Sequence, residues 1–357
     1  MRLAAILSTA VVLSLAMASA QPSSGGPYKV LKTARVGGEG GWDYIYADAA
    51  GRRLYIPRRG NNEIPTRLAI FDLDTLQPAG EIAGVGGQGA AVDPKTGHGF
   101  TSSKPVSMFD TKTKQLIKTI DVGAAAPDGI LFDAFNERVY IFSHPTKDAT
   151  VIDAKDGTVL GTIDLGGVPE QGVSDGRGTL YVVMQDTPGS VTVVDAKTMK
   201  AAAHYSIGDK GRCNGLALDV KNKVLFAACA NSGTPPSDPP KPMMVILSAA
   251  DGRILTDLPL AGGSDGAVFN PATMETFSTH GNGTLTVVKE TSPTTFEVEQ
   301  NLQTMNGART ITLDAKTNHI LTMSDERGPA PPPPPGGGRA GRPPAIPGSF
   351  TILMIGK

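Results

Sequence analysis

The sequence DGILFDAFNERVYIFSHPTKDATVIDAKDGTVLGTI, residues 128–163, contains four short apolar runs separated by turn residues. The runs cover residues 130–133, 139–142, 149–153 and 159–163. They are rich in β-branched and aromatic residues and are bounded by Gly, Asp and Asn, a pattern typical of short β-strands. The stretch therefore predicts one four-stranded antiparallel unit.

The unit recurs along the chain. An apolar residue followed by a small residue, mostly glycine, opens each copy, at residues 36, 85, 122, 165, 207 and 260, with a weaker copy near residue 305. Successive copies are 37 to 53 residues apart, which is the period of a propeller blade with insertions. Because a single blade cannot cover both of its faces, we expect the blades to stack around an axis.

The two ends of the sequence predict how the ring closes. The last copy supplies only three strands, over residues 308–314, 319–323 and 349–355. The fourth is available at the other end, over about residues 28–36. We therefore predict an all-β fold: a single seven-bladed β-propeller of four-stranded antiparallel blades, residues 28–357, closed by pairing of segment 28–36 with segment 349–355. An open solenoid would need polar capping repeats, and the sequence shows none.

The first twenty residues are expected to lie outside the propeller. Arg2 precedes the apolar stretch 3–17, and Ala18-Ser19-Ala20 has the pattern of a cleavage site. This predicts a signal peptide over 1–20, cut after Ala20, a disordered spacer over 21–27, and a periplasmic or secreted protein. An uncleaved membrane anchor is the rival interpretation, but the stretch is short for a span and lacks a basic stop-transfer flank.

The charge balance bears on the class of partner. Lys and Arg total 33 and Asp and Glu total 34, which disfavours a nucleic acid as partner. The pairs Arg52-Arg53 and Arg58-Arg59 are the local exceptions and keep DNA or anionic-polymer binding as an alternative. After residue 20 no apolar run is long enough to be a transmembrane segment.

Several strand phrases carry a family resemblance. Examples are Tyr44-Ile45-Tyr46, Val139-Tyr140-Ile141 and Leu180-Tyr181-Val182-Val183, each set between turn signals and followed by a strand ending in Asp. Over residues 28–357 the chain resembles the YVTN-repeat, YncE-like β-propeller family. The resemblance implies a seven-bladed propeller at the bacterial periplasm or cell surface, and no single activity. The chain departs from the repeat's Thr-Asn ending, for example at Pro57-Arg58, so no residue role carries over.

Because strand direction alternates within a blade, two sets of loops fall on the same side of the ring, which we call the upper rim. One set enters the first strand of each blade, and the other connects the second strand to the third. Polar side chains gather in these loops, and a mouth of mixed carboxylates and guanidiniums suits a small polar or anionic ligand. As an alternative role, an Asp in such a loop commonly caps its own turn. The single Trp could stack on a ligand or pack between blades. The candidate ligand-binding residues are Trp42, Asp43, Arg58, Gln88, Asp128, His144, Glu170, Gln171, Arg212, Asn214, Asp265, His280 and Arg309.

A metal site and a catalytic site are less clearly marked. His144 and His280 map to the upper rim, where Asp128, Asp265 and Glu170 could complete an oxygen-rich site for a divalent cation. Motifs for covalent haem, an α/β-hydrolase nucleophile or a zinc protease are not found. The sequence therefore predicts no organic cofactor and assigns no catalytic residue.

The two cysteines are expected to form a disulfide. Cys213 precedes the first strand of the fifth blade and Cys229 ends the second, and residue 221 of the intervening turn lies midway between them. The two side chains should therefore face each other across the hairpin, in an oxidising compartment. A reactive thiol is the alternative.

Three insertions fall in upper-rim loops, at residues 58–65, 231–242 and 325–348, the last of them rich in Pro and Gly. Segment 325–348 is either a tolerated insertion or a lid or docking strap. Taken together, the sequence favours a monomeric binding scaffold for a small ligand or a protein. The alternatives are a hydrolase or lactonase-like enzyme using rim carboxylates with a divalent cation, and DNA binding.

Overall fold

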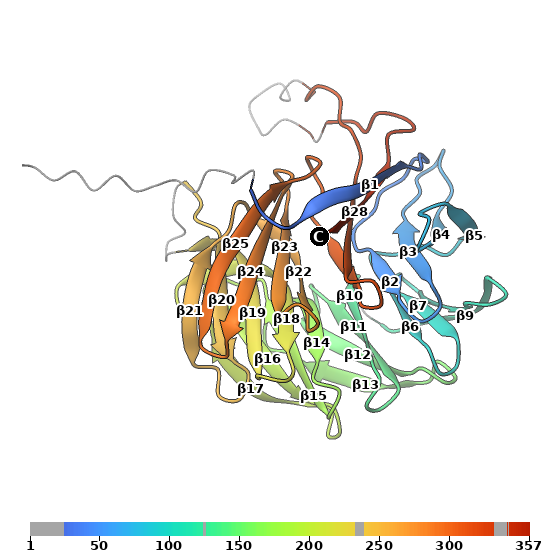
Figure 1. The fold of residues 1–357 in the computed structure, drawn as a ribbon. Coiled ribbons are helices and arrows are strands. Elements are labelled where there is room, and N and C mark those ends of the chain that lie inside the picture. The colour runs from blue at the N-terminus through green and yellow to red at the C-terminus, as the bar shows by residue number, and fades with distance from the viewer. Residues whose placement is uncertain (1–24, 124–125, 233–238, 332–340, 342) are drawn as a thin grey trace, which may run out of the picture.

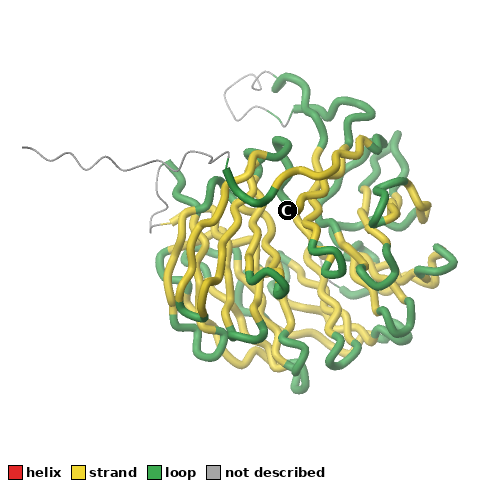
Figure 2. The backbone as a smooth tube through the Cα atoms, viewed as in Figure 1, coloured by secondary structure: helices red, strands yellow, loops and turns green. Residues whose placement is uncertain are grey.

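The computed structural model describes residues 25–123, 126–232, 239–331, 341 and 343–357. Strands and loops make up this described part, which contains no helix (Figure 2). Within these ranges, no helix has the length and hydropathy that crossing a lipid bilayer requires. The predicted signal peptide 1–20 and most of the spacer 21–27 lie outside the described residues, as do parts of the insertions at 231–242 and 325–348.

The strands form seven antiparallel sheets of four strands each, which are the seven predicted blades (Figure 1). The strands of blades 1 to 4 are β2 (Tyr46–Asp48), β3 (Arg53–Arg58), β4 (Arg67–Asp72), β5 (Pro78–Ala83); β6 (Ala90–Asp93), β7 (His98–Thr101), β8 (Val106–Asp110), β9 (Gln115–Ile120); β10 (Pro127–Asp133), β11 (Arg138–Ser143), β12 (Asp148–Asp153), β13 (Val159–Asp164); β14 (Pro169–Ser174), β15 (Thr179–Met184), β16 (Ser190–Asp195), β17 (Lys200–Ser206).

The strands of blades 5 to 7 are β18 (Lys210–Asp219), β19 (Val224–Ser232), β20 (Met243–Ser248), β21 (Ile254–Pro259); β22 (Ser264–Asn270), β23 (Glu275–His280), β24 (Thr284–Ser292), β25 (Thr295–Gln303); β26 (Ile311–Asp314), β27 (His319–Ser324), β28 (Thr351–Gly356) and β1 (Lys29–Arg35). The first strand of each blade contacts the first strand of the next, from β2 through β26 and back to β2. The seven inner strands therefore surround one axis.

Ring closure is as predicted, because β1 pairs antiparallel with β28 and completes blade 7. In Figure 1 β1 and β28 lie between the blade of β22–β25 and the blade of β2–β5. The N-terminal segment also contacts blade 6, where Tyr28 is buried against Phe277 of β23 with ring centroids 5.0 Å apart. Joining the first strand to the last leaves no open blade between the two ends of the chain.

Apolar side chains from neighbouring blades form the core. The middle strands supply most of it: β11 has the pattern of an almost continuously buried strand, and β12 and β15 are similar. The outermost strands alternate between exposed and half-buried positions, as β17 does. Burial thus decreases from the middle strands to the outermost strand. This is expected for a sheet that is covered on both faces near the axis and exposed at its outer edge.

The predicted disulfide is present. Cys213 of β18 and Cys229 of β19 are bonded, and they are direct cross-strand partners with Cα atoms 3.7 Å apart. Both side chains are fully buried in the apolar cluster between blades 4 and 5. The described residues contain no free cysteine, so the structure favours the disulfide over a reactive thiol.

Candidate functional site

One position is equivalent in all seven blades and builds the upper mouth of the channel. It lies five residues before the Asp or Asn that ends or directly follows each inner strand. That terminal residue caps the next turn, as Asp48 does by accepting a hydrogen bond from the Gly51 amide at 2.8 Å. The seven equivalent residues are Asp43, Gln88, Asp128, Glu170, Asn214, Asp265 and Arg309.

The residue after this position allows the blades to approach closely. In four blades it is glycine, at positions 89, 129, 215 and 266. At Gly129 an added Cβ atom would lie 2.8 Å from the backbone carbonyl oxygen of Glu170 in the next blade. A side chain at position 129 therefore has no room. The close packing of the backbone at this glycine holds the preceding polar residue at the mouth.

In blade 1 the position after Asp43 is occupied by Tyr44 and not by glycine. Its amide donates to the Gln88 carbonyl at 3.0 Å. Its hydroxyl lies 3.1 Å from Glu170 Oε2 and 3.3 Å from Asp128 Oδ2, so the side chain connects blade 1 with blades 3 and 4. Burial, followed by the charge of Glu170, raises the pKa of Tyr44 well above its usual value, and the phenol stays protonated as a donor.

Asp128, His144 and Glu170 form the most concentrated polar group, which we call the Asp–His–Glu cluster. His144 follows β11, and its Nε2 atom lies 3.2 Å from Asp128 Oδ2 and 3.4 Å from Glu170 Oε1. Asp128 and Glu170 are buried and His144 is half-buried. One ligand atom from each residue falls within 4.8 Å of the other two.

The electrostatics of the cluster follow from burial of two like charges. Burial, and then repulsion from Asp128, raises the pKa of Glu170 to about 8. The Asp128 carboxylate raises the pKa of His144 above its usual value, against the opposing effect of burial. A positive charge placed here would therefore be strongly favoured.

The other half of the mouth is already neutralised. Arg309 Nη1 lies 2.7 Å from Asp265 Oδ2, and its Nη2 lies 3.3 Å from Asp43 Oδ1. Arg59 Nη1 lies 3.7 Å from Asp43 Oδ2 and also contacts the Gln88 amide oxygen. Burial raises the pKa of Asp43 to about 6, and Arg309 opposes that rise. Both guanidiniums are thus occupied by protein carboxylates.

Amide side chains connect the two halves. Asn214 Nδ2 donates to Asp265 Oδ1 at 3.0 Å. Gln185, which follows β15, donates to Glu170 Oε1 at 2.6 Å and lies 3.4 Å from Asn214 Oδ1. The mouth is therefore one network of polar contacts drawn from every blade.

Two predicted site residues support the rim from beneath. Trp42 is buried between blades 1 and 7, tilted against Phe350, and its indole Nε1 donates to Asp325 Oδ2 at 3.2 Å. Arg58 is also buried, stacks on the Phe350 ring, and donates to the carbonyls of Gly38 and Gly40. Arg58 lies outside the polar mouth, whereas the Trp42 ring adjoins it, with the Arg309 guanidinium 5.6 Å from the ring centroid.

Three others lie apart from the Asp–His–Glu cluster. Gln171 holds inner strands together, because its Oε1 accepts from the Leu216 and Ala267 amides and its Nε2 donates to the Ala267 carbonyl. His280 is fully buried, with Nδ1 2.8 Å from Thr284 Oγ1. The side chain of Arg212 is exposed.

Several cavities adjoin this arrangement. One, of about 520 Å³, is lined by Trp42, Asp325 and Arg327 among others. Another, of about 420 Å³, opens between blades 1 and 2 and is lined by Arg59, Gln88 and Lys104 among others. A further cavity, also about 420 Å³, lies within the channel beyond Gln171 and is lined by residues of the inner strands such as Leu131 and Val173.

Comparison with known proteins supports the fold. The chain is similar to a structure titled "Kuenenia stuttgartiensis Hydrazine Synthase", at 17% identity with a TM-score of 0.67, covering 79% of this chain and 92% of that one. It is also similar to "Structure of U3-55K" (9% identity, TM-score 0.67, 93% and 99% covered) and "Crystal structure of RRP9 WD40 repeats" (10%, 0.68, 94% and 98%).

No family model matches the chain, and no curated protein matches it. The structural likenesses therefore establish a seven-bladed β-propeller, and they do not establish the predicted YVTN-repeat, YncE-like family.

Among the side chains of the mouth described above, Tyr44 is the one that the sequence did not place on the upper rim. Aligning the seven copies on the terminal Asp or Asn would have found Tyr44, because it stands where four blades have glycine. Arg59 and Gln185 belong to the loops between second and third strands, which the strand direction predicted to lie on the upper rim.

Proposed function

We propose that this chain is an exported, YVTN-repeat, YncE-like propeller that acts as a binding scaffold, and that its upper mouth takes a small ligand with a positively charged group. The observation that supports the proposal is that the carboxylates of the mouth differ in their positively charged partners. Asp43 and Asp265 have arginine partners, whereas in the described part of the chain Asp128 and Glu170 share a single basic partner, the half-buried His144, and pair with no lysine or arginine.

This charge distribution leads us to propose a cationic ligand in place of the small polar or anionic ligand that the sequence favoured. An anionic ligand would have to compete with Asp43 and Asp265 for Arg309 and Arg59. A positive group, in contrast, would relieve the repulsion between Asp128 and Glu170, and it would do so in a partly buried site where screening is weak. The adjoining cavity of about 420 Å³ gives room for the rest of such a ligand.

A binding screen tests the proposal. Small amines, guanidinium compounds and amino acids would be titrated against the purified mature protein by calorimetry, with the fluorescence of the single Trp42 as a second readout. Trp42 is suited to this because the Arg309 guanidinium lies 5.6 Å from its ring centroid. We expect at least one positively charged compound to bind.

The control is a pair of variants. The double variant Asp128→Asn/Glu170→Gln removes both carboxylate charges and should abolish binding. Glu297→Gln makes the same chemical change at an exposed position of the outer strand β25 and should leave binding intact. Equal binding by the double variant, or exclusive binding of anions, would contradict the proposal.

A hydrolase using rim carboxylates and a divalent cation is the second candidate. The mixed carboxylate and imidazole donors of the Asp–His–Glu cluster favour it. Turnover of ester or lactone substrates that disappears on Glu170→Gln, but persists on Glu297→Gln, would promote it above the scaffold.

DNA binding is not favoured. The two arginine pairs that kept it open are engaged with the protein: Arg52 pairs with Asp314 and Asp74, and Arg53 pairs with Asp72. Arg58 is buried, as described above. These side chains are therefore poorly placed to neutralise a series of phosphates.

A further inference from the structure

The donor atoms of the Asp–His–Glu cluster have the spacing of ligands around one ion. Asp128 Oδ2 and Glu170 Oε1 lie 3.2 and 3.4 Å from His144 Nε2. A tetrahedral Zn²⁺ with ligands at about 2.0–2.1 Å places neighbouring donors about 3.3 Å apart. That separation fits a single cation bound by all three donors.

The imidazole is oriented for coordination. The Nε2 atom of His144 is buried and has no aligned hydrogen-bond partner, although both carboxylates are close to it. An unprotonated Nε2 in this position presents its lone pair to an ion placed between it and the two carboxylates.

The carboxylates are held as well. Gln185 donates to Glu170 Oε1 at 2.6 Å, and the Tyr44 hydroxyl lies 3.1 Å from Glu170 Oε2. The backbone next to Asp128 packs closely against that of Glu170, since a Cβ atom at Gly129 would lie 2.8 Å from the Glu170 carbonyl oxygen. The cluster is thus supported by neighbouring groups, as functional metal sites are.

We propose that Asp128, His144 and Glu170 bind one divalent transition-metal ion, for which Zn²⁺ is the test ion, at the upper mouth of the propeller. This inference rests on the proposed function, because it assigns the positive charge taken up by the mouth to a metal ion. Three protein donors would leave a coordination position open toward solvent on the half-buried His144 side, where a further ligand oxygen or water can bind.

The donor set selects among cations. An imidazole nitrogen suits Zn²⁺ and its first-row neighbours, whereas Mg²⁺ and Ca²⁺ prefer oxygen ligands. Ca²⁺ in particular takes six to eight oxygens, more than the two carboxylates and one phenol that converge here. We therefore expect Zn²⁺ to bind far more tightly than Ca²⁺ at this site.

The experiment is a metal titration of the full mature protein after removal of metal with EDTA. Elemental analysis after dialysis gives the stoichiometry, and calorimetry gives the affinity for Zn²⁺ and for Ca²⁺. We expect one Zn²⁺ per chain and a loss of affinity of at least tenfold for Asp128→Asn, His144→Gln and Glu170→Gln, since even changes beside a metal ligand typically cost ten- to hundredfold.

Matched controls make the result specific. His204→Gln changes an exposed histidine of the outer strand β17, and Glu297→Gln an exposed glutamate of β25; both should bind Zn²⁺ like the unaltered protein. Circular dichroism of each variant shows whether it is folded. No stoichiometric Zn²⁺, equal affinity in the His144→Gln variant, or tighter binding of Ca²⁺ would overturn the inference.

The two proposals fail in different ways. If Zn²⁺ does not bind but an organic cation does, and Asp128→Asn/Glu170→Gln abolishes that binding, the metal inference is wrong and the binding function stands. If neither a metal nor an organic cation binds, both are wrong.

Discussion

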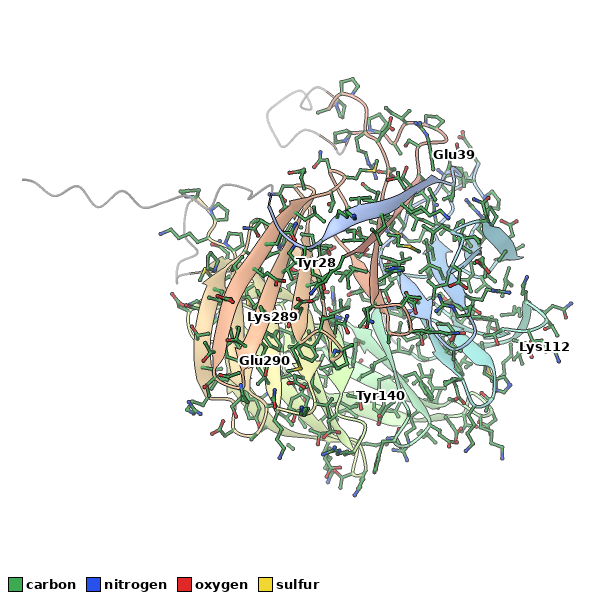
Figure 3. The ribbon with its side chains drawn as sticks, viewed as in Figure 1. Tyr28, Glu39, Lys112, Tyr140, Lys289 and Glu290 are labelled. Carbon is green, nitrogen blue, oxygen red and sulfur yellow. A yellow bond between two sulfur atoms is a disulfide. The ribbon has the colours of Figure 1, made fainter. Side chains whose placement is uncertain are left out.

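Tyr28 is the residue through which the N-terminal segment, whose strand β1 closes the ring, also contacts blade 6. Its side chain is 3% exposed and packs edge-on against Phe277. Its hydroxyl donates to the fully buried Glu275 carboxylate, while its backbone exchanges two hydrogen bonds, each of 2.9 Å, with the Gln300 side chain. Figure 3 labels Tyr28 where the chain enters β1. The residue thus joins the closing strand to blade 6.

Two substitutions separate the contributions. Tyr28→Phe removes only the hydroxyl and its charged acceptor, for which we expect a loss of about 2 kcal/mol in the free energy of unfolding. Glu275 keeps Lys357 at 2.8 Å and Lys289 at 3.4 Å, which limits the cost. Tyr28→Ala also removes the buried ring, and truncation of a buried aromatic costs about 3–5 kcal/mol.

Urea unfolding followed by circular dichroism measures both effects. The midpoint should fall in the order unaltered protein, Tyr28→Phe, Tyr28→Ala, with little change in the slope, since the surface exposed on unfolding is nearly the same. Thr33→Ala, an exposed change on the same strand, should stay within about 0.5 kcal/mol. A loss below 1 kcal/mol for Tyr28→Ala would refute the view that this contact secures the ring.

Three further outcomes are expected. Burial lowers the pKa of His280 from 6.5 to about 4, so the folded state binds fewer protons than the unfolded state; stability is complete above pH 6.5 and falls by up to about 3 kcal/mol toward pH 4. His280→Gln should flatten this part of the stability curve, and an unchanged slope would contradict the assignment. Reduction of Cys213–Cys229, or its replacement by two alanines, should cost roughly 3 kcal/mol in denaturant unfolding; a variant as stable as the oxidised protein would argue otherwise. Gly129→Ala should cost about 1–3 kcal/mol, because its Cβ would lie 2.8 Å from a backbone carbonyl of the next blade. Gly263→Ala, whose Cβ meets only an alanine methyl at 3.5 Å, is the control, and equal losses for both would refute the close-packing argument.

Some features of the site were predictable because they depend on local sequence. The position five residues before each terminal Asp or Asn recurs with the blade period, so its seven members fall on one rim once the strands are placed. The facing cysteines were predictable for the same reason, because hairpin register alone determines which residues are cross-strand partners.

Other features were not predictable, because they depend on how blades pack against one another. Trp42 and Arg58 have the composition of ligand-binding residues, yet packing around Phe350 buries both beneath the rim. His144 and His280 looked equivalent by position, but only His144 meets two carboxylates. No periodicity of the chain distinguishes them.

The amino-acid sequence by itself determined the all-β class, the sevenfold repeat, the pairing of the two ends and the disulfide, because each follows from strand periodicity, turn residues and hairpin register. The tertiary structure alone decided which polar residues became partners: Asp128, His144 and Glu170 belong to two blades, and Tyr44 reaches them from a third. Their charges interact because the close packing of the inner strands brings separate repeats within a few ångströms in a partly buried site, where electrostatic interactions are strong.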